Sequence, residues 1–380
     1  QTATVPSAGD GTVTDPYLIS SLNELYWVSE QTFSTLDWSD GKYFLQTKDI
    51  DASDTTNWNN GWIPIGGRDS QTLADNFKRF KGIYNGNNHS ISDLYINSNI
   101  IYNGLFGRID TQGKVVNLNI SNVNLFVGDS GGKTGSLVGE NGGDIYNCSS
   151  SVNGTDKTGG LVGSYQTTKR YIEKCYSNST VANNGINVGG FLGWLQSGSI
   201  VNSNNNYWNS SKFVGTEGLG AQNNGTTYQA SGLTGLTDDQ IKNASNFSGW
   251  DFEGETTNGK YDLWKIGSDG YPTVYDNGNI WTGASSTNWS TASNWSGGEA
   301  PNNNSLSSRN IVYIPSGLSN YPSLTPNAKA FIVKIADGAR IDFNNKTINY
   351  SFLIYEEEDI IIPLSTSETT PEDTPFTFTL

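Results

Sequence analysis

The sequence is poor in the residues on which most catalytic and metal sites depend. It contains one histidine, His89, two cysteines, Cys148 and Cys175, and no methionine. A Ser-His-Asp triad, a Cys-His pair and a metal site built on several histidines all require histidine. One histidine leaves little material for any of these sites, so we expect no catalytic residue, no metal and no cofactor.

Positive charge and long apolar runs are scarce as well. The 22 basic residues stand against 37 acidic ones, and the net charge is −15. Because phosphate groups bind to basic faces, nucleic acid and anionic lipid are excluded as expected partners. No run of about 20 apolar residues occurs, so we expect no membrane insertion of this segment. The start of the chain, Gln1–Thr4, is not a signal peptide, which predicts a mature or trimmed segment of a secreted protein.

Glycine and asparagine are abundant instead, and both adopt positive φ at low cost. Frequent turns between many short strands are therefore expected. Aromatic residues make up 12% of the chain, which is enough to form a sizeable core. Only 16% of residues are charged. A length of 380 residues allows two domains. These features together indicate an all-β protein.

A short glycine-flanked phrase, G-[GS]-[LF]-[LV]-G, recurs at intervals of 24 to 32 residues. Its four copies are Gly104-Leu105-Phe106-Gly107, Gly135–Gly139, Gly159–Gly163 and Gly189–Gly193. A repeat of this length fits one coil of a parallel β-solenoid, in which neighbouring coils stack about 4.8 Å apart. Helical solenoids are excluded because glycine is too frequent and no window has a sustained 3.6-residue period. We therefore expect Leu105, Leu137, Leu161 and Phe191 to form one interior ladder.

A second phrase alternates with the first. Its five copies are Ile91-x-x-Leu94, Val115-x-x-Leu118, Ile145-x-x-Cys148, Ile172-x-x-Cys175 and Ile200-x-x-Ser203. The residue before the last position is Asp93, Asn117, Asn147, Lys174 or Asn202. Two interleaved phrases in a constant order indicate a repeat architecture. We expect Ile91, Val115, Ile145, Ile172 and Ile200 to form a second interior ladder.

The open ends of a solenoid need covers. Capping boxes at Ser21–Glu24 and Thr237–Gln240 predict short helices at the two ends. The composition changes near Asp276–Asn279, and the predicted domains are a capped β-helix over 1–276, a second all-β module over 277–364 and a Ser/Thr/Pro-rich tail or linker over 365–380. The strand-like runs of the second module include Ile311–Ile314 and Ile360–Ile362.

The glycine-flanked phrases resemble the GLUG repeat, which occurs in bacterial cell-surface and adhesion proteins and in the N-terminal region of IgA-cleaving metallopeptidases. The resemblance extends to the approach, Phe80 to Leu94, to Trp62–Gly66, and to the closing Trp250-Asp251-Phe252, and covers roughly residues 10–275. It implies a right-handed parallel β-helix displayed outside the cell. In those peptidases a separate zinc domain with an H-E-x-x-H helix carries the chemistry. This chain has no such phrase, so the peptidase activity is not expected here.

Each candidate site has a structural alternative. Cys148 and Cys175 fall at equivalent positions and predict either a buried thiol ladder, continuing Leu118 and followed by Ser203, or a disulfide. For His89 a hydrogen bond at a turn is favoured over catalysis.

The acidic group Asp49, Asp51 and Asp54 has the oxygen ligands of a calcium site but also fits an ordinary strand. The tryptophans of the first coils are expected in the core rather than as sugar platforms. They are Trp27, Trp38, Trp58 and Trp62.

Binding, catalysis and a structural role remain as functional hypotheses. The favoured one is a non-enzymatic, secreted bacterial surface adhesin that presents a rigid β-helix to a host-surface protein or glycan. The first alternative is a glycan-active lyase or hydrolase, for which acids and bases would have to meet in a groove. Bases are few in the coils, and the sequence singles out no acid. The basic residues of the coils are chiefly Lys114, Lys133, Lys157, Lys169, Arg170 and Lys174. The second alternative is a structural stalk segment of a larger secreted protein.

Overall fold

The computed structural model describes residues 1–12, 15–35, 37–67, 78–98, 100–127, 133–154, 158–166, 170–181, 187–195, 202–220, 232–255, 257, 262–275, 278–302, 310–330, 332–336, 338–349, 352–355 and 360–363. The chain divides into two compact units. The first comprises Gln1–Ser7, Tyr17–Trp250 and Ile266–Val274, and the second Ala8–Pro16, Asp251–Lys265 and Tyr275–Leu380. The predicted domain boundary at residues 276 and 277 lies outside the described residues and stays a prediction.

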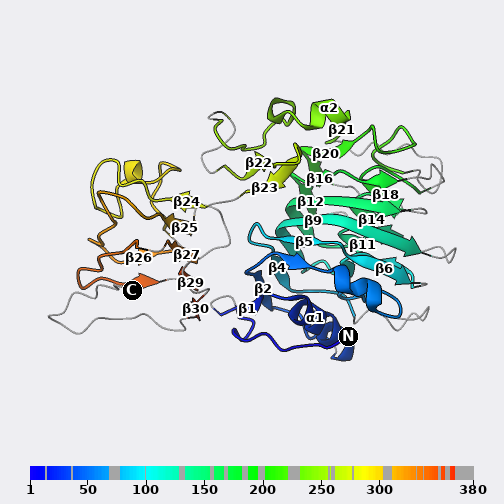
Figure 1. The fold of residues 1–380 in the computed structure, drawn as a ribbon, viewed down its shortest axis with the longest axis horizontal. Helices are drawn as coiled ribbons and strands as arrows, with labels where there is room; N and C mark the ends of the chain where they lie inside the picture. The colour runs from blue at the N-terminus through cyan, green and yellow to red at the C-terminus, as the bar shows by residue number, and fades with distance from the viewer. Residues whose placement is uncertain are drawn as a thin grey trace. The chain divides into compact units, whose positions relative to one another are not determined.

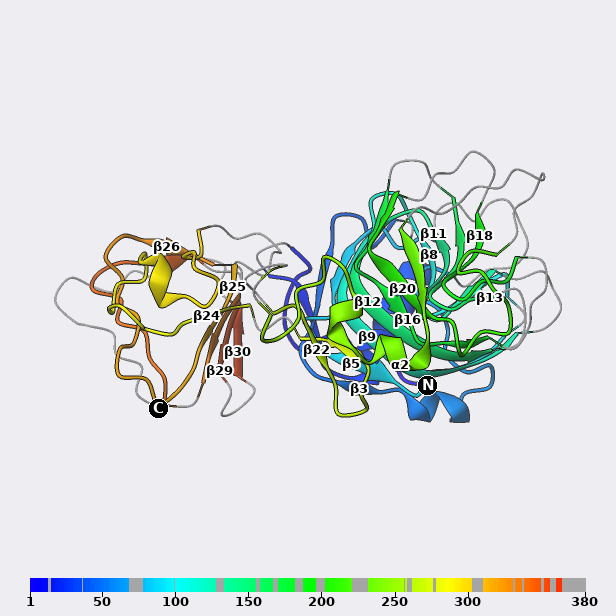
Figure 2. The same ribbon diagram turned by 90° about the horizontal axis from the view of Figure 1, so that it is seen from above.

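The first unit is a solenoid of stacked parallel coils, about eight turns within the described residues, so the predicted β-helix is confirmed (Figure 1). Its largest sheet, sheet A, contains β1 (Tyr17–Ile19), β2 (Tyr43–Gln46), β3 (Ile50–Asp51), β4 (Ile83–Asn85), β5 (Ser90–Ser92), β6 (Tyr95–Ser98), β9 (Lys114–Val127), β12 (Asp144–Gly154), β15 (Tyr171–Glu173), β16 (Tyr176–Ser177), β17 (Thr180–Val181), β19 (Asn202–Asn204), β20 (Asn206–Asn209) and β21 (Leu233–Leu236). Figure 2 gives the view along the stack.

Two smaller parallel sheets complete the coils. Sheet B contains β8 (Phe106–Ile109), β11 (Val138–Asn141), β14 (Val162–Tyr165) and β18 (Leu192–Leu195). Sheet C contains β7 (Tyr102–Asn103), β10 (Lys133–Gly135) and β13 (Thr158–Gly159). In Figure 1 the colour runs in chain order along the stack, from α1 (Leu22–Ser34) at one end to α2 (Asp238–Ile241) at the other. The short strands β22 (Trp264–Ile266) and β23 (Pro272–Val274) follow α2 in the chain.

The ladder predicted from the glycine-flanked phrases is confirmed. Phe106, Val138, Val162 and Leu192 pair in register along sheet B, which places the residues before them at equivalent positions. Leu105, Leu137, Leu161 and Phe191 are all buried in the apolar core. Each of these phrases therefore supplies one layer of the core, because parallel in-register stacking puts like residues above like.

The second predicted ladder is correct only in part. Val115 pairs with Ile145 and Ile145 with Ile172, as expected. Ile91, however, pairs with Ile120 and Ile50, while Tyr84 takes the place next to Val115. The repeated phrase does not fix the pairing of Ile91, because β9 contains two bends with the same residue pattern, Val115-x-x-Leu118 and Ile120-x-x-Val123. Ile91 is equivalent to the first residue of the second bend.

At the far end of that ladder the register differs again. Ile200 lies outside the described residues, and Ile172 pairs with Ser203. Asn206, not Ser203, then follows Cys175, and its side chain accepts a hydrogen bond of 2.8 Å from the Cys175 backbone N–H. The shift of three residues was not visible in the sequence because Ile200-x-x-Ser203 keeps the spacing of the phrase. Only the pairing of neighbouring coils selects the register.

The residue before the last position of the phrase forms a left-handed bend. Asn117, Asn147 and Lys174 have φ of 53°, 50° and 51°, and Asn205, not the predicted Asn202, continues the series at 52°. Asparagine tolerates this conformation better than most residues. The amide of Asn147 also donates to the Asn117 side chain at 3.1 Å. The sequence pattern at this position therefore follows from backbone geometry and from stacking of side-chain amides.

Cys148 and Cys175 are both fully buried, unbonded and in line with Leu118. Each Sγ lies 3.2 Å from the carbonyl oxygen two residues earlier in its own coil, so the two thiols have matching environments. Burial, with the neighbouring Cys148 thiol, raises the pKa of Cys175 well above its ordinary value. The thiol alternative of the sequence analysis agrees with this arrangement.

The predicted N-terminal cap is α1. The Ser21 hydroxyl accepts a hydrogen bond from the Glu24 backbone N–H, as expected for an N-cap. The Glu24 carboxylate accepts from the backbone N–H and hydroxyl of Ser20 rather than from Ser21, so the reciprocal half of the box lies one residue earlier. Trp27 of α1 and Trp62 are buried in the core, and Trp38 and Trp58 pack half-buried against the core.

The second unit is smaller and mostly β. Its main sheet consists of β24 (Asn279–Ile280), β25 (Ile311–Ile314), β27 (Ile332–Ile335), β29 (Phe352–Tyr355) and β30 (Ile360–Pro363), of which only β30 runs antiparallel within the described residues. The strands β26 (Ala328–Lys329) and β28 (Ile348–Asn349) pair separately. The 3-10 turn η4 (Ala292–Asn294) also belongs to this unit, whereas η1 (Ser53–Asn57) and η3 (Ala244–Asn246) belong to the first. Trp281, Trp289 and Trp295 form the centre of the core of the second unit.

We expect native protein to react slowly with a thiol reagent and to react fast once unfolded, because both thiols are buried. Replacing both Cys148 and Cys175 with Ala should lower the free energy of unfolding by about 1–3 kcal/mol through lost packing. Thiol labelling and denaturant unfolding measure the two effects. Thr111→Cys, at an exposed position, is the control that should react fast in native protein. Rapid native labelling of the unmodified chain would contradict the register.

Candidate functional site

The residue that follows each glycine-flanked phrase takes the same position in each strand of sheet B. These residues are Arg108, Glu140, Ser164 and Trp194, and they pair in register along β8, β11, β14 and β18. The next residues in three of the strands, Ile109, Tyr165 and Leu195, belong to the core. Because in-register parallel strands place equivalent side chains on one face, the four residues form a row, which we call the polar row.

Glu140 is the centre of this row, with a side chain that is only 2% exposed. The Arg108 Nε donates to its carboxylate at 3.1 Å, and Arg79 Nη2 lies 3.5 Å away. The Lys133 ammonium and the Gln166 amide also donate to it. Pairing of Phe80 with Ile109 aligns Arg79 with Arg108, so adjacent coils supply the two guanidinium groups.

Among the described residues, positive charge exceeds negative charge around Glu140. Arg79, Arg108 and Lys133 surround this one carboxylate, with Asp110 interacting with Arg79 electrostatically. Burial lowers the pKa of Lys133 despite the Glu140 carboxylate. Burial and then the Arg108 charge lower the pKa of Arg79. This cluster, which we call the Glu140 cluster, therefore holds partly desolvated cations in a chain of strongly negative net charge.

Aromatic rings and unpaired donors border the Glu140 cluster. The Arg108 guanidinium lies 4.5 Å from the ring centre of Tyr102, and the Lys133 ammonium lies 4.8 Å from that of Trp194. Among the described residues, the buried Nε of Arg79 and the buried Nε1 of Trp194 have no hydrogen-bond acceptor. Chemically, the cluster offers charge and N–H donors to an oxyanion.

The structure places His89 at a turn, as predicted. Its backbone N–H donates to the Gly86 carbonyl at 2.9 Å, after two left-handed residues, Asn87 and Asn88. Its Nδ1 lies 3.5 Å from Asp49 Oδ1. The Glu140 cluster does not include it.

The acidic candidates Asp49, Asp51 and Asp54 make separate local contacts. Asp49 accepts from the Ser90 backbone N–H at 2.7 Å, and Asp51 accepts from that of Ser53 at 2.8 Å. Asp54 is exposed on η1. No group of three or more His, Cys, Asp or Glu residues suited to a metal occurs in the described part of the chain.

Sequence reasoning missed most of the Glu140 cluster. Lys133 was noted as one of the few bases, whereas Arg79, Arg108 and Glu140 were not singled out. The sequence does contain one indication of the cluster, which is the position of these residues: Arg108, Glu140 and Trp194 each directly follow the last glycine of a phrase. Of the other bases noted, Lys114 lies near the Tyr146 ring, Arg170 pairs with Asp144, and Lys174 forms a bend. Lys157 and Lys169 lie outside the described residues.

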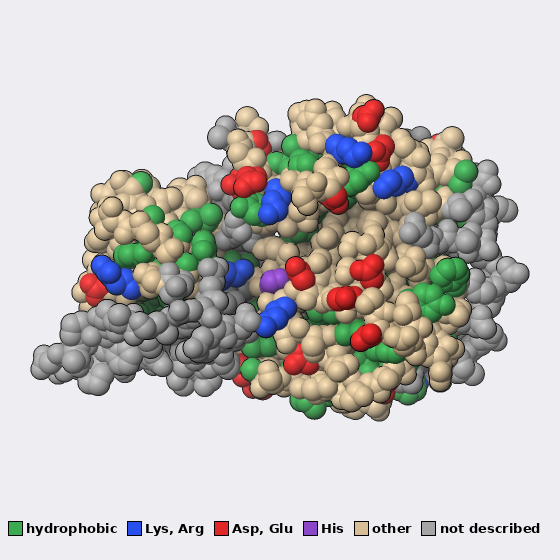
Figure 3. All heavy atoms as spheres, viewed as in Figure 1, with side chains coloured by type: hydrophobic (Ala, Val, Ile, Leu, Met, Phe, Trp, Pro, Cys, Tyr) green, Lys and Arg blue, Asp and Glu red, His purple; other side chains and the backbone are tan. Residues whose placement is uncertain are grey.

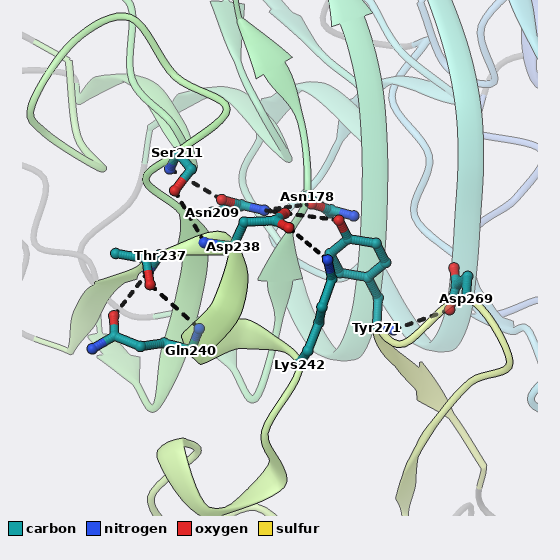
Figure 4. A network of polar contacts seen from close by, with 9 residues as sticks. All are labelled: Asn178, Asn209, Ser211, Thr237, Asp238, Gln240, Lys242, Asp269 and Tyr271. Carbon is teal, nitrogen blue, oxygen red and sulfur yellow. Dashed lines mark hydrogen bonds and ion pairs between the residues drawn. The ribbon is translucent and has the colours of Figure 1, made fainter.

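A second polar network fastens α2 to the last coils (Figure 4). Asp238 accepts hydrogen bonds from Lys242 at 2.6 Å, Tyr271 at 2.7 Å and Asn209 at 2.8 Å. Asn209 in turn donates to Asn178 one coil earlier. Lys242 and then Tyr271 hold the pKa of Asp238 below its ordinary value. The predicted capping box of Thr237 and Gln240 is present in full, and this network has a structural role as an end cap.

Charged side chains are sparse on one face of the protein. On the face drawn in Figure 3, uncharged polar side chains and backbone make up most of the surface, and charged side chains are scattered. Among the described residues, no helix has the length and apolar character needed to cross a membrane.

Comparisons with known proteins give partial relatives. A scan of known protein families finds no match for this chain, so the predicted GLUG membership stays a prediction. The chain is 34% identical over 160 residues (41% of it) to halomucin of Haloquadratum walsbyi, and 32% identical over 148 residues (39%) to a protein of Evansella cellulosilytica named as a Gly-rich membrane protein. The matches span only 2% and 16% of those proteins. A solved chain from Bacteroides ovatus, described as an immunoglobulin A1 protease, is similar over 70% of this chain and 94% of its own, with 18% identity and a TM-score of 0.40.

The Asp238 network predicts a pH-dependent contribution to stability. Asp238→Asn should lower the free energy of unfolding at neutral pH by about 1 kcal/mol, because it weakens partly exposed charged hydrogen bonds. Since the folded-state pKa of Asp238 is depressed, its contribution is present above the ordinary aspartate pKa and is lost as pH falls through the depressed value. The difference from the unmodified chain should therefore narrow below about pH 4 in denaturant unfolding. Asp239→Asn, at the exposed neighbour, is the control, and a difference independent of pH would contradict this account.

Proposed function

We propose that this chain is a non-enzymatic binding segment of a bacterial cell-surface protein and presents its β-helix to a host-surface protein or glycan. The observation that carries the proposal is the continuous in-register stack, in which each coil is paired with its neighbours and filled by buried ladders. Such a stack is rigid and extended, which suits a surface that holds a binding site away from a cell.

The partial relatives support an extracellular setting. Their names refer to a halomucin and to a membrane protein, and this chain matches only a small part of each. A segment that recurs within larger surface proteins fits a binding or spacer role better than that of a free-standing enzyme. Adhesion, the bacterial cell surface and the identity of the ligand are parts of the proposal.

A glycan-active enzyme is the second candidate function, and one contact favours it. Glu140 lies beside Arg108 and Lys133, so one acid and two bases meet on one face of the solenoid. Against it, Glu140 already accepts hydrogen bonds from Arg108, Lys133 and Gln166 and lies 3.5 Å from Arg79, so its carboxylate oxygens are occupied. With only 2% of its side chain exposed, Glu140 is also poorly placed to reach a glycosidic oxygen.

An array of glycans and host-surface proteins, probed with the full chain, tests the proposal. We expect saturable binding to one ligand class and no change in the bound glycans on long incubation, measured by chromatography of the recovered sugars. Chain unfolded in denaturant and diluted onto the array is the control for binding that needs no fold. Cleavage products that disappear with Glu140→Gln would contradict the non-enzymatic role and favour the second candidate.

A further inference from the structure

The Glu140 cluster has more positive charge than its one central carboxylate neutralises. Glu140 is already bound by Arg108, Lys133 and Gln166, so it does not depend on Arg79, whose nearest contact is longer at 3.5 Å. Arg79 is nevertheless mostly buried, with 18% of its side chain exposed. Burying three cations beside one carboxylate is costly, and Asp110 adds only an electrostatic interaction with Arg79. If the cluster served only to hold Glu140 in place, it would not need Arg79 as a third cation.

Donor groups at the same place also lack acceptors. The Nε of Arg79 and the indole Nε1 of Trp194 are buried without an acceptor among the described residues. Buried donors are satisfied in most proteins, and each exception calls for a partner. An oxyanion supplies both the missing negative charge and several acceptor lone pairs. A planar guanidinium is well suited to such a group because two of its N–H donors can bind two oxygens.

We propose that Arg79, Arg108 and Lys133 form a binding site for the carboxylate or sulfate group of an acidic glycan. The half-buried Trp194 ring and the Gln166 amide lie beside Lys133 and Glu140. An aromatic face together with an amide suits a sugar ring, which has both apolar C–H faces and hydroxyl groups. An acidic peptide would bind to the positive charges but would not need an aromatic ring next to an amide. The proposal rests on the proposed function and names a ligand class for it.

The stacked register explains how the site arises. Arg79 and Arg108 come from successive coils, and Glu140 comes from the next coil along the polar row. The row therefore runs along the solenoid axis with cations at one end and Trp194 at the other. The exposed parts of the cluster belong to Arg79, Lys133 and Trp194, so a chain-like ligand would place its acidic group at Arg79 and Lys133 and a neighbouring ring at Trp194.

The test measures binding of an oligogalacturonate to the full chain by calorimetry at low ionic strength. A neutral oligosaccharide of equal length and poly-glutamate are compared with it. Arg79→Gln should weaken oligogalacturonate binding about tenfold or more, which corresponds to roughly 1.4 kcal/mol. The matched control is Arg170→Gln, which removes the same charge from the Asp144 pair on the same unit and should leave the affinity unchanged. Added salt should weaken binding to the unmodified chain.

A second variant separates ligand binding from a structural role. Glu140→Gln removes the competing carboxylate, so anion binding should become tighter, and inorganic sulfate should raise the melting temperature of this variant more than that of the unmodified chain. If Glu140→Gln does not fold, Arg79→Gln decides alone, since Glu140 keeps its other donors in that variant. Equal affinities of Arg79→Gln and the unmodified chain, or no binding of any anion, would overturn the site.

The remaining outcomes separate the site from the proposed function. Poly-glutamate binding as tight as oligogalacturonate binding would overturn the glycan as ligand and leave a carboxylate site for an acidic protein. Array binding that Arg79→Gln does not change would remove this site while the proposed binding function stands. Conversely, cleavage of the oligosaccharide would overturn the non-enzymatic function, whereas loss of its binding in Arg79→Gln would still support the site.

Discussion

Parallel, in-register stacking of coils is the constraint on which this structure depends. The strand β12 pairs with β9 on one side and with β15, β16 and β17 on the other, so both edges of its backbone are satisfied by neighbouring coils. A coil has no core of its own, because its apolar residues are covered only by those above and below. Each position is therefore restricted by its equivalents in adjacent coils, and the repeat in the sequence records that restriction.

The same constraint explains the glycine that closes each phrase. A Cβ on Gly139 would lie 2.8 Å from the carbonyl oxygens of Gly107 and Lys133, and a Cβ on Gly163 would lie 2.4 Å from the Thr134 nitrogen. These backbones approach one another too closely for a side chain. Glycine lets sheet C lie directly against sheet B, and this brings Lys133 within reach of Glu140. Core packing and the polar cluster thus share one geometric cause.

Stacking also leaves two ends to be covered, and the chain covers them differently. At the N-terminal end α1 and its tryptophans cover the first coils with apolar surface. At the C-terminal end Tyr207, Phe247 and Trp250 pack together, and the Asp238 network ties α2 to Asn209. One end is held mainly by burial, and the other by burial combined with charged hydrogen bonds.

Local patterns were enough to determine the all-β solenoid, its caps and the Leu105–Leu137–Leu161–Phe191 ladder, because flanking glycines fix where each of these strands begins and ends. They could not place Ile91, because two bends with the same residue spacing follow one another in β9, and only pairing with the next coil distinguishes them. The full Glu140 cluster could not be predicted from the sequence for a related reason. Arg79 lies outside any repeated phrase, and only the stacking of coils brings it to Arg108 and Glu140.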